Sequence, residues 1–147
     1  MNGAQDGGGA RQGTGFVNLV LNGTSLSITG SYSGLTVAST GGHIHGPAAP
    51  GVNASIIYPL DALGIITLGS TSGTYAGTVN LAAIGGYTLA QQLVDLNNGL
   101  WYLNVHDSAF PGGEIRGQIL AVPEPSALAI LGVGGAGILF RRRRMVK

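Results

Sequence analysis

Three histidines are the residues of this chain best suited to hold a metal ion. His43 and His45 are separated by one residue, and His106 lies in a second segment that reads Asn-Val-His-Asp. Alternate side chains share a face in an extended segment, so His43 and His45 are expected to point to the same side. Three imidazoles with an open fourth position are the ligand set of a catalytic zinc or copper site. Asp107 follows directly and is a candidate fourth ligand, or a residue that hydrogen-bonds to a ligating histidine and orients it.

The same alternation predicts a polar face around these histidines. Tyr102, Asn104 and His106 share one side of their segment, while Trp101, Leu103 and Val105 share the other. Glu114 and Arg116 are two residues apart, which predicts an ion pair or a hydrogen-bonding network with the histidines. Paired in one sheet, these strands would form one polar network over an apolar core, built from Asn104, Asp107, Glu114 and Arg116. The alternative to metal binding is that the histidines bond to Glu114, Asn104 and loop carbonyls and fix strand register.

We expect no catalytic residues in this chain. The sequence contains neither a serine nucleophile elbow nor a Walker phosphate-binding loop. Glycoside hydrolysis needs two carboxylates that flank a groove. Glu114 and Asp107 are the pair to consider, but the sequence does not position the second of them. Metal-dependent activity at the histidines is the remaining route to an enzyme.

Short strands joined by tight turns must position these residues. Residues 14–21 and 25–32 read as two strands with a hairpin turn at Asn22-Gly23. Further strands are expected at 35–39, 43–45, 54–58, 74–81 and 101–106, and around 115–119. We therefore predict an all-β fold, an antiparallel β-sandwich or flattened barrel of about seven or eight strands, superoxide-dismutase-like or immunoglobulin-like.

One helix is expected within this domain, over residues 88–96. Thr88 and Gln91 have the spacing of a capping box, and Leu89, Leu93 and Leu96 fall on one face. Gly99 is placed to end the helix. The segment is short, so we expect it to pack across an open end of the sheets.

Charge divides the chain into two parts. Residues 1–121 contain two arginines and five carboxylates, a net charge of −3, while residues 122–147 contain five basic residues and one glutamate, a net charge of +4. The basic character belongs to the tail, so we expect no nucleic-acid binding by the domain. There is no cysteine, which excludes disulfides and thiolate chemistry.

The histidine-containing segments resemble a known family. His43-Ile44-His45-Gly46-Pro47-Ala48, the later Val105-His106, and the closing run from Pro111 to Gln118 are similar to the motifs of the CHRD (chordin-type) domain. The resemblance covers residues 3–121 and implies a β-sandwich domain in an exported protein. Copper-zinc superoxide dismutases also carry His-x-His on a β-sandwich strand. This chain lacks their further zinc-ligand histidines and their cysteines, so dismutase activity is not expected.

The chain changes character after Ala121. Pro123-Glu124-Pro125 interrupts regular structure, residues 126–140 are uncharged and apolar, and residues 141–147 begin with Arg141, Arg142, Arg143 and Arg144. A helix of 15 residues is about 22 Å long, shorter than the bilayer's hydrocarbon core of about 30 Å. The four arginines are expected to stop transfer and stay on the cytoplasmic side.

This tail resembles a PEP-CTERM sorting signal. The resemblance implies transient residence in the inner membrane with the domain outside, and then cleavage by an exosortase near Pro123-Glu124-Pro125. An ordinary stop-transfer anchor is the alternative. Residues 1–13 contain no apolar run, so we expect Met1 to be a truncated or misassigned start with a signal peptide encoded upstream.

Two functions from different classes follow from these observations. The first is a non-enzymatic cell-surface or extracellular-matrix protein, including biofilm matrix, that binds exopolysaccharide or other surface proteins and needs no cofactor. The second is a zinc- or copper-binding, or redox, module that uses His43, His45 and His106.

Overall fold

The computed structural model describes residues 1–6 and 11–122. Within them the chain forms seven strands, one α-helix and the short 3₁₀ helix η1 (Gly3–Asp6). Strands β1 (Thr14–Asn22), β2 (Ser25–Ser33) and β5 (Gly73–Asn80) form one antiparallel sheet in the order β1-β2-β5. Strands β3 (Ser39–His45), β4 (Ile56–Pro59), β6 (Tyr102–Asp107) and β7 (Ile115–Gln118) form the other in the order β4-β3-β6-β7. The all-β prediction of two antiparallel sheets is confirmed.

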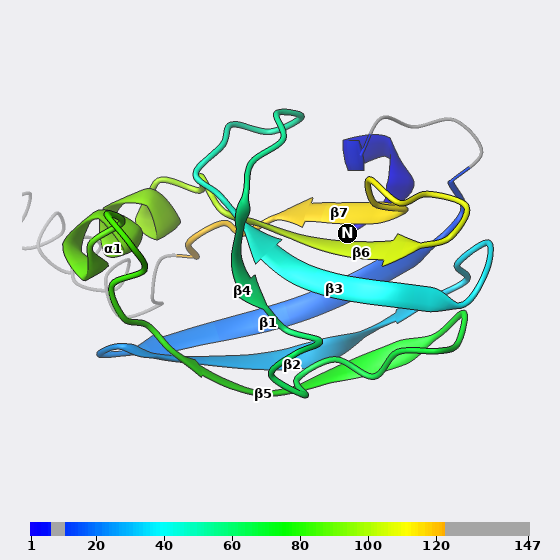
Figure 1. The fold of residues 1–147 in the computed structure, drawn as a ribbon, viewed down its shortest axis with the longest axis horizontal. Coiled ribbons are helices and arrows are strands. Elements are labelled where there is room, and N and C mark those ends of the chain that lie inside the picture. Colours follow the sequence, from blue (N-terminus) through cyan, green and yellow to red (C-terminus); the bar gives the residue numbers. More distant parts are fainter. Residues whose placement is uncertain (7–10, 123–147) are drawn as a thin grey trace, which may run out of the picture.

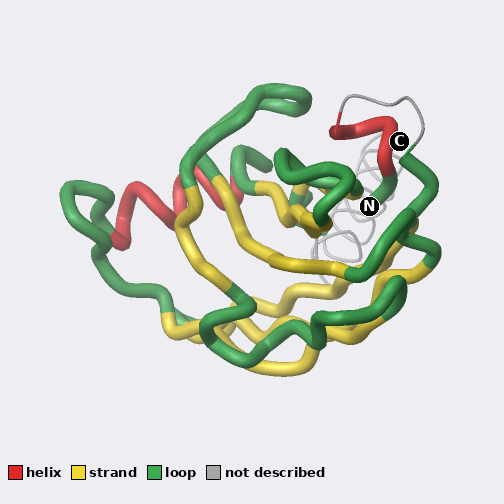
Figure 2. The backbone as a smooth tube through the Cα atoms, turned by 45° about the vertical axis from the view of Figure 1, so that its right-hand side comes forward, coloured by secondary structure: helices red, strands yellow, loops and turns green. Residues whose placement is uncertain are grey.

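The two sheets face each other across one apolar core (Figure 1). Alternate residues of each strand enter this core, as Leu26 and Ile28 do from β2 and Leu103 and Val105 from β6. Figure 2 shows how the strands of both sheets curve around this common interior. Trp101 is fully buried and lies just before β6, with its ring 5.9 Å from that of Tyr58.

The β1–β2 hairpin is present, with its turn one residue later than predicted. Asn22 pairs with Ser25, so the central turn residues are Gly23 and Thr24. Gly23 has a φ of 61° and no non-glycine residue has a positive φ in the described ranges. A two-residue turn with positive φ only at its first central residue is of type II′, which takes glycine there. The strand pairing therefore makes Gly23 the first central residue of the turn.

Residues 35–38 do not form the predicted strand, because their backbone bonds to loops. The Leu35 amide donates to Thr71 O, the Thr36 amide to Glu114, and the Ser39 amide to Ser70 O. Strand β3 starts only at Ser39. The alternation in this segment was too short to distinguish a strand from an extended loop.

The predicted helix is α1 (Leu89–Asn97), which lies at one end of the sandwich (Figure 1). Thr88 caps it by accepting from the Gln91 amide at 3.2 Å. The side chain of Gln91 donates to Asp95 at 3.1 Å instead of completing the capping box. Gln92 is fully buried, accepts from Tyr58 Oη at 2.6 Å and donates to Ala82 O at 2.7 Å, and so ties the helix to the sheet.

The predicted sorting tail, with its apolar helix over 126–140, lies outside the described residues. In the part of the chain that the structure does describe, α1 is the only α-helix, and no helix has the length and apolarity needed to cross a bilayer.

Candidate metal centre

The three histidines lie on one face of neighbouring strands. β3 supplies His43 and His45, and β6, which pairs with it, supplies His106 opposite Gly41. The ring centres are 4.9 Å apart for His43 and His106, 5.6 Å for His43 and His45, and 5.8 Å for His45 and His106. One ring nitrogen from each lies within 4.8 Å of one from each of the others. The opposite face of both strands carries buried Ile44 and Val105, so the pleat that builds the core also gathers the imidazoles.

Each histidine ring bonds to a partner outside the cluster. His43 Nε2 lies 3.0 Å from Asp61 Oδ2. His45 Nδ1 lies 3.0 Å from the Ala54 carbonyl oxygen, and His106 Nδ1 lies 2.9 Å from the Pro111 carbonyl oxygen. Within the cluster, His43 Nδ1 and His106 Nε2 are 3.1 Å apart. Each ring is therefore anchored by one nitrogen and turns the other toward the cluster.

Asp61 is a candidate site residue that the sequence pattern does not indicate. It follows β4 and Leu60, and its carboxylate lies 3.0 Å from His43 Nε2, close enough for an ion pair when the histidine is protonated. The one feature of the sequence that could have drawn attention to Asp61 is the small number of carboxylates, since residues 1–121 contain only five. Gly41 makes room for this contact, since a Cβ there would lie 3.2 Å from His43 Cε1 and 3.4 Å from Asp61 Oδ2.

Tyr102 and Arg116 support the cluster from one side. The Tyr102 ring stacks on His45, with centres 4.9 Å apart and an interplanar angle of 5°. The Arg116 guanidinium lies over Tyr102 and donates to Val52 O at 2.8 Å and Asn53 Oδ1 at 3.3 Å. Arg116 thereby fixes the loop between β3 and β4, which projects beyond the sheet in Figure 1.

His45 is held in its neutral form. Burial lowers its pKa to about 4, and the nearby charges of His106, His43 and Arg116 act in the same direction against the hydrogen bond to Ala54. A neutral imidazole retains a lone pair on one nitrogen, which is the form that binds metals. The Nε2 atom of His45 is buried and has no hydrogen-bond partner among the described residues.

Glu114 and Asp107 form a separate carboxyl pair. Both are buried, at 0% and 1% exposure. Glu114 accepts from the Thr36 amide at 2.9 Å, the Thr36 hydroxyl at 2.9 Å and the Gly13 amide at 3.2 Å. The network that the sequence predicted between Glu114, Arg116 and the histidines is not formed among the described residues. Glu114 precedes β7, so strand alternation does not govern its direction.

The pKa values of the two carboxyl groups are shifted in opposite directions. Burial raises the pKa of Asp107, and the facing Glu114 raises it further. Burial also acts to raise the pKa of Glu114, but its hydrogen bonds from Asp107, Thr36 and Gly13 lower it overall. Asp107 Oδ1 accepts from the Phe110 amide at 2.6 Å, and Oδ2 is buried without a partner that donates to it. Asp107 thus faces Glu114 and bonds to Phe110, which gives it a structural role apart from the histidines.

Asn104 stabilises the loop that carries Pro111. Its amide nitrogen donates to the Gly112 carbonyl at 3.1 Å, and the residue is 2% exposed. The bonds of Asn104 and His106 to this loop hold it against β6. Asn104 thus lies beside the cluster and acts on the loop instead of bonding to a histidine ring.

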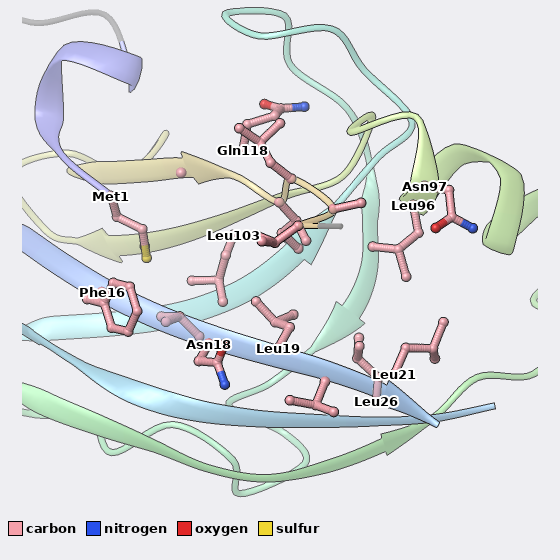
Figure 3. A pocket seen from close by; sticks show the side chains of 17 residues that line it. Met1, Phe16, Asn18, Leu19, Leu21, Leu26, Leu96, Asn97, Leu103 and Gln118 are labelled. Carbon is pink, nitrogen blue, oxygen red and sulfur yellow. The ribbon is translucent and has the colours of Figure 1, made fainter. Parts of the chain in front are cut away.

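A large apolar groove lies away from the histidines, between the edges of the two sheets (Figure 3). It has a volume of about 720 Å³ and is lined by β1, the end of β7 and the residues after it. At one end the Met1–Asn2 backbone bonds to both edges, to Gly15 of β1 and to Arg116 of β7. The exposed side chains of Phe16 and Leu120, at 74% and 70%, flank this groove.

The chain matches two family models. The CHRD domain model matches residues 1–119, and the PEP-CTERM protein-sorting motif matches residues 121–144. Comparisons with the curated proteins and with the solved structures give no match. The first model covers both histidine motifs and every described strand, and the second covers the Pro-Glu-Pro segment and the arginine cluster. This chain therefore belongs to the CHRD domain family and carries a C-terminal PEP-CTERM sorting motif.

Proposed function

We propose that this chain is a cell-surface or extracellular-matrix protein whose CHRD domain acts without catalysis, as a binding or structural module. The observation that carries this proposal is the sorting motif over residues 121–144. A PEP-CTERM motif implies export and processing by an exosortase at the membrane. The partners we propose for the released domain are exopolysaccharide or other surface proteins.

The absence of catalysis is supported by the burial of the carboxyl pair. Asp107 and Glu114 are 1% and 0% exposed; Asp107 accepts from the Phe110 amide, and Glu114 accepts from Thr36 and Gly13. Two such carboxyls cannot flank a sugar substrate, which needs an open groove between them. Their burial therefore speaks against Asp107 and Glu114 as the carboxyl pair of a glycosidase.

Sorting is tested by replacing Pro123, Glu124 and Pro125 with alanine in the full chain. The wild-type protein should reach the surface without Arg141 to Lys147, and the variant should stay full-length in the inner membrane. Intact mass spectrometry of fractionated cells measures both outcomes. A surface form that retains Arg141 to Lys147 identifies the tail as a permanent anchor. Capture of purified exopolysaccharide by the released domain then tests the binding role.

The second candidate function is a metal-binding or redox module at His43, His45 and His106. The specific observation in its favour is the 3.1 Å separation of His43 Nδ1 and His106 Nε2 while both rings bond elsewhere. A bound metal is compatible with surface location, so the two candidates differ in what the domain does and not in where it acts.

A further inference from the structure

We infer that His43 Nδ1, His45 Nε2 and His106 Nε2 are the three protein ligands of one Zn²⁺ or Cu²⁺ ion, and that Asp61 is the positioning residue of this site. The inference rests on the second candidate function and adds the ligand atoms, their tautomers and the residue that orients them.

The proton positions on the three rings follow from their outer partners. The carbonyls of Ala54 and Pro111 can only accept, so His45 and His106 each donate from Nδ1. The carboxylate of Asp61 likewise accepts from Nε2 of His43. In a neutral imidazole with one nitrogen protonated, the other nitrogen carries a lone pair. All three rings therefore turn lone pairs toward the centre of the cluster.

Three converging lone pairs need a cation. His43 Nδ1 and His106 Nε2 face each other at 3.1 Å, and two lone pairs at that distance repel unless something positive lies between them. The other tautomer of His106 would donate to His43 but would turn its Nδ1 lone pair toward the Pro111 carbonyl. A single proton between His43 Nδ1 and His106 Nε2 would satisfy those two rings. It would leave His45 Nε2 buried without a partner among the described residues. One metal ion satisfies all three.

The spacing suits a small divalent ion. Zn–N distances of about 2.0–2.1 Å in a tetrahedral site place the ligand nitrogens roughly 3.4 Å apart. This value lies between the 3.1 Å that separates His43 Nδ1 from His106 Nε2 and the 4.8 Å within which all three candidate ligand atoms lie. Imidazole ligands suit zinc and copper, and Cu²⁺ should bind more tightly than Zn²⁺.

The outer partners are those that metal-bound histidines use. Such histidines donate their second nitrogen to a carboxylate or a backbone carbonyl, which fixes the tautomer and the ring direction. Here Asp61 has that role for His43, and two carbonyls have it for the others. The His43 side chain is 16% exposed, so solvent can reach the site and a water molecule can complete the coordination.

The experiment titrates the purified, chelator-treated full chain with Zn²⁺ by calorimetry and with Cu²⁺ by electron paramagnetic resonance. We expect one ion per chain and nitrogen splitting from three imidazoles. His43→Gln, His45→Gln and His106→Gln should each abolish binding, while Asp61→Asn should weaken it about 10–100-fold. Asp107→Asn is the matched control, because Asp107 adjoins a ligand in sequence but bonds to Phe110 and faces Glu114. It should bind like the unchanged chain.

Circular dichroism of each metal-free variant shows whether it folds, and Asp61→Asn removes no ligand, so it tests the site even if a histidine variant unfolds. The inference is overturned if no ion binds, if fewer than three nitrogens bind copper, or if Asp61→Asn and Asp107→Asn have equal affinity. If the chain is released at the surface but binds no metal, the metal site is rejected and the proposed sorting stands. A metal-binding chain retained in the membrane would reject only the proposed sorting.

Discussion

The guanidinium carbon of Arg116 lies 3.3 Å from the centre of the Tyr102 ring, and that ring stacks on His45. Arg116 is 1% exposed, so this cation–π contact is formed away from water. A buried arginine is stabilised here by an aromatic face and by two oxygens of the β3–β4 loop. The contact links the loop, strand β7 and the histidine cluster.

Arg116→Lys should therefore lower the free energy of unfolding by roughly 2 kcal/mol, the size of a desolvated cation–π contact. Lysine keeps the charge but lacks the planar group that stacks and donates to two oxygens. Arg11→Lys is the matched control, because Arg11 lies 4.7 Å from the Phe110 ring and is only partly buried. It should cost less than about 1 kcal/mol. Urea denaturation measures the free energy of unfolding of both variants. Equal losses would mean that the buried Arg116–Tyr102 contact stabilises the domain no more than the partly buried Arg11–Phe110 contact.

Asp107→Asn should leave the domain at least as stable at neutral pH, with a gain of up to about 1 kcal/mol. The amide can donate to Glu114 permanently, whereas Asp107 must keep a proton to do so. The folded-state pKa of Asp107 is raised, so its contribution is complete at low pH and is lost as pH rises through that pKa. The variant should lose this dependence in urea midpoints measured across pH.

Glu114→Gln is expected to act in the opposite direction from Asp107→Asn. The lowered pKa of Glu114 means that its contribution is present above the ordinary pKa and is lost as pH falls through the folded value. Replacing the carboxylate removes an acceptor of several buried donors, so stability should fall by more than 1 kcal/mol. A Glu114→Gln domain as stable as the unchanged one at pH 7 would contradict the role of the Glu114 carboxylate as the acceptor of these donors.

Three tyrosines should resist ionisation until the domain unfolds. Burial raises the pKa of Tyr87 to about 12 and raises those of Tyr58 and Tyr75. The folded pKa of Tyr87 exceeds its unfolded value of about 10, so stability is present below pH 10 and falls between pH 10 and 12. Absorbance at the tyrosinate band in native buffer and in concentrated urea measures the difference. Superimposable titration curves would contradict the burial of these hydroxyls.

Gln92→Leu should destabilise the domain by roughly 3 kcal/mol, because it leaves buried groups of Tyr58, Ala82 and Tyr87 without their partner. The control Gln91→Leu changes the neighbouring, exposed glutamine of the same helix and should cost less than about 1 kcal/mol. Thermal melts followed by circular dichroism separate the two. A small loss at position 92 would show that water replaces the missing bonds.

The sequence alone determined the features that depend on near neighbours along the chain. Alternation placed His43 and His45 on one face, and the Thr88 cap marked the start of α1. These predictions succeed because the pleat of a strand and the cap of a helix are local geometry. The family motifs also lie within short stretches, so their order along the chain was enough to recognise them.

Only the tertiary structure decided which distant groups meet. Asp61 reaches His43 because β4 pairs with β3, and no local pattern encodes that pairing. Glu114 bonds to Thr36 and Gly13, which loops bring to it from 78 and 101 residues away. Loop residues follow no period, and their partners depend on how both sheets close over the core. The sequence therefore specified the face that carries the histidines, while long-range packing determined which residues orient them.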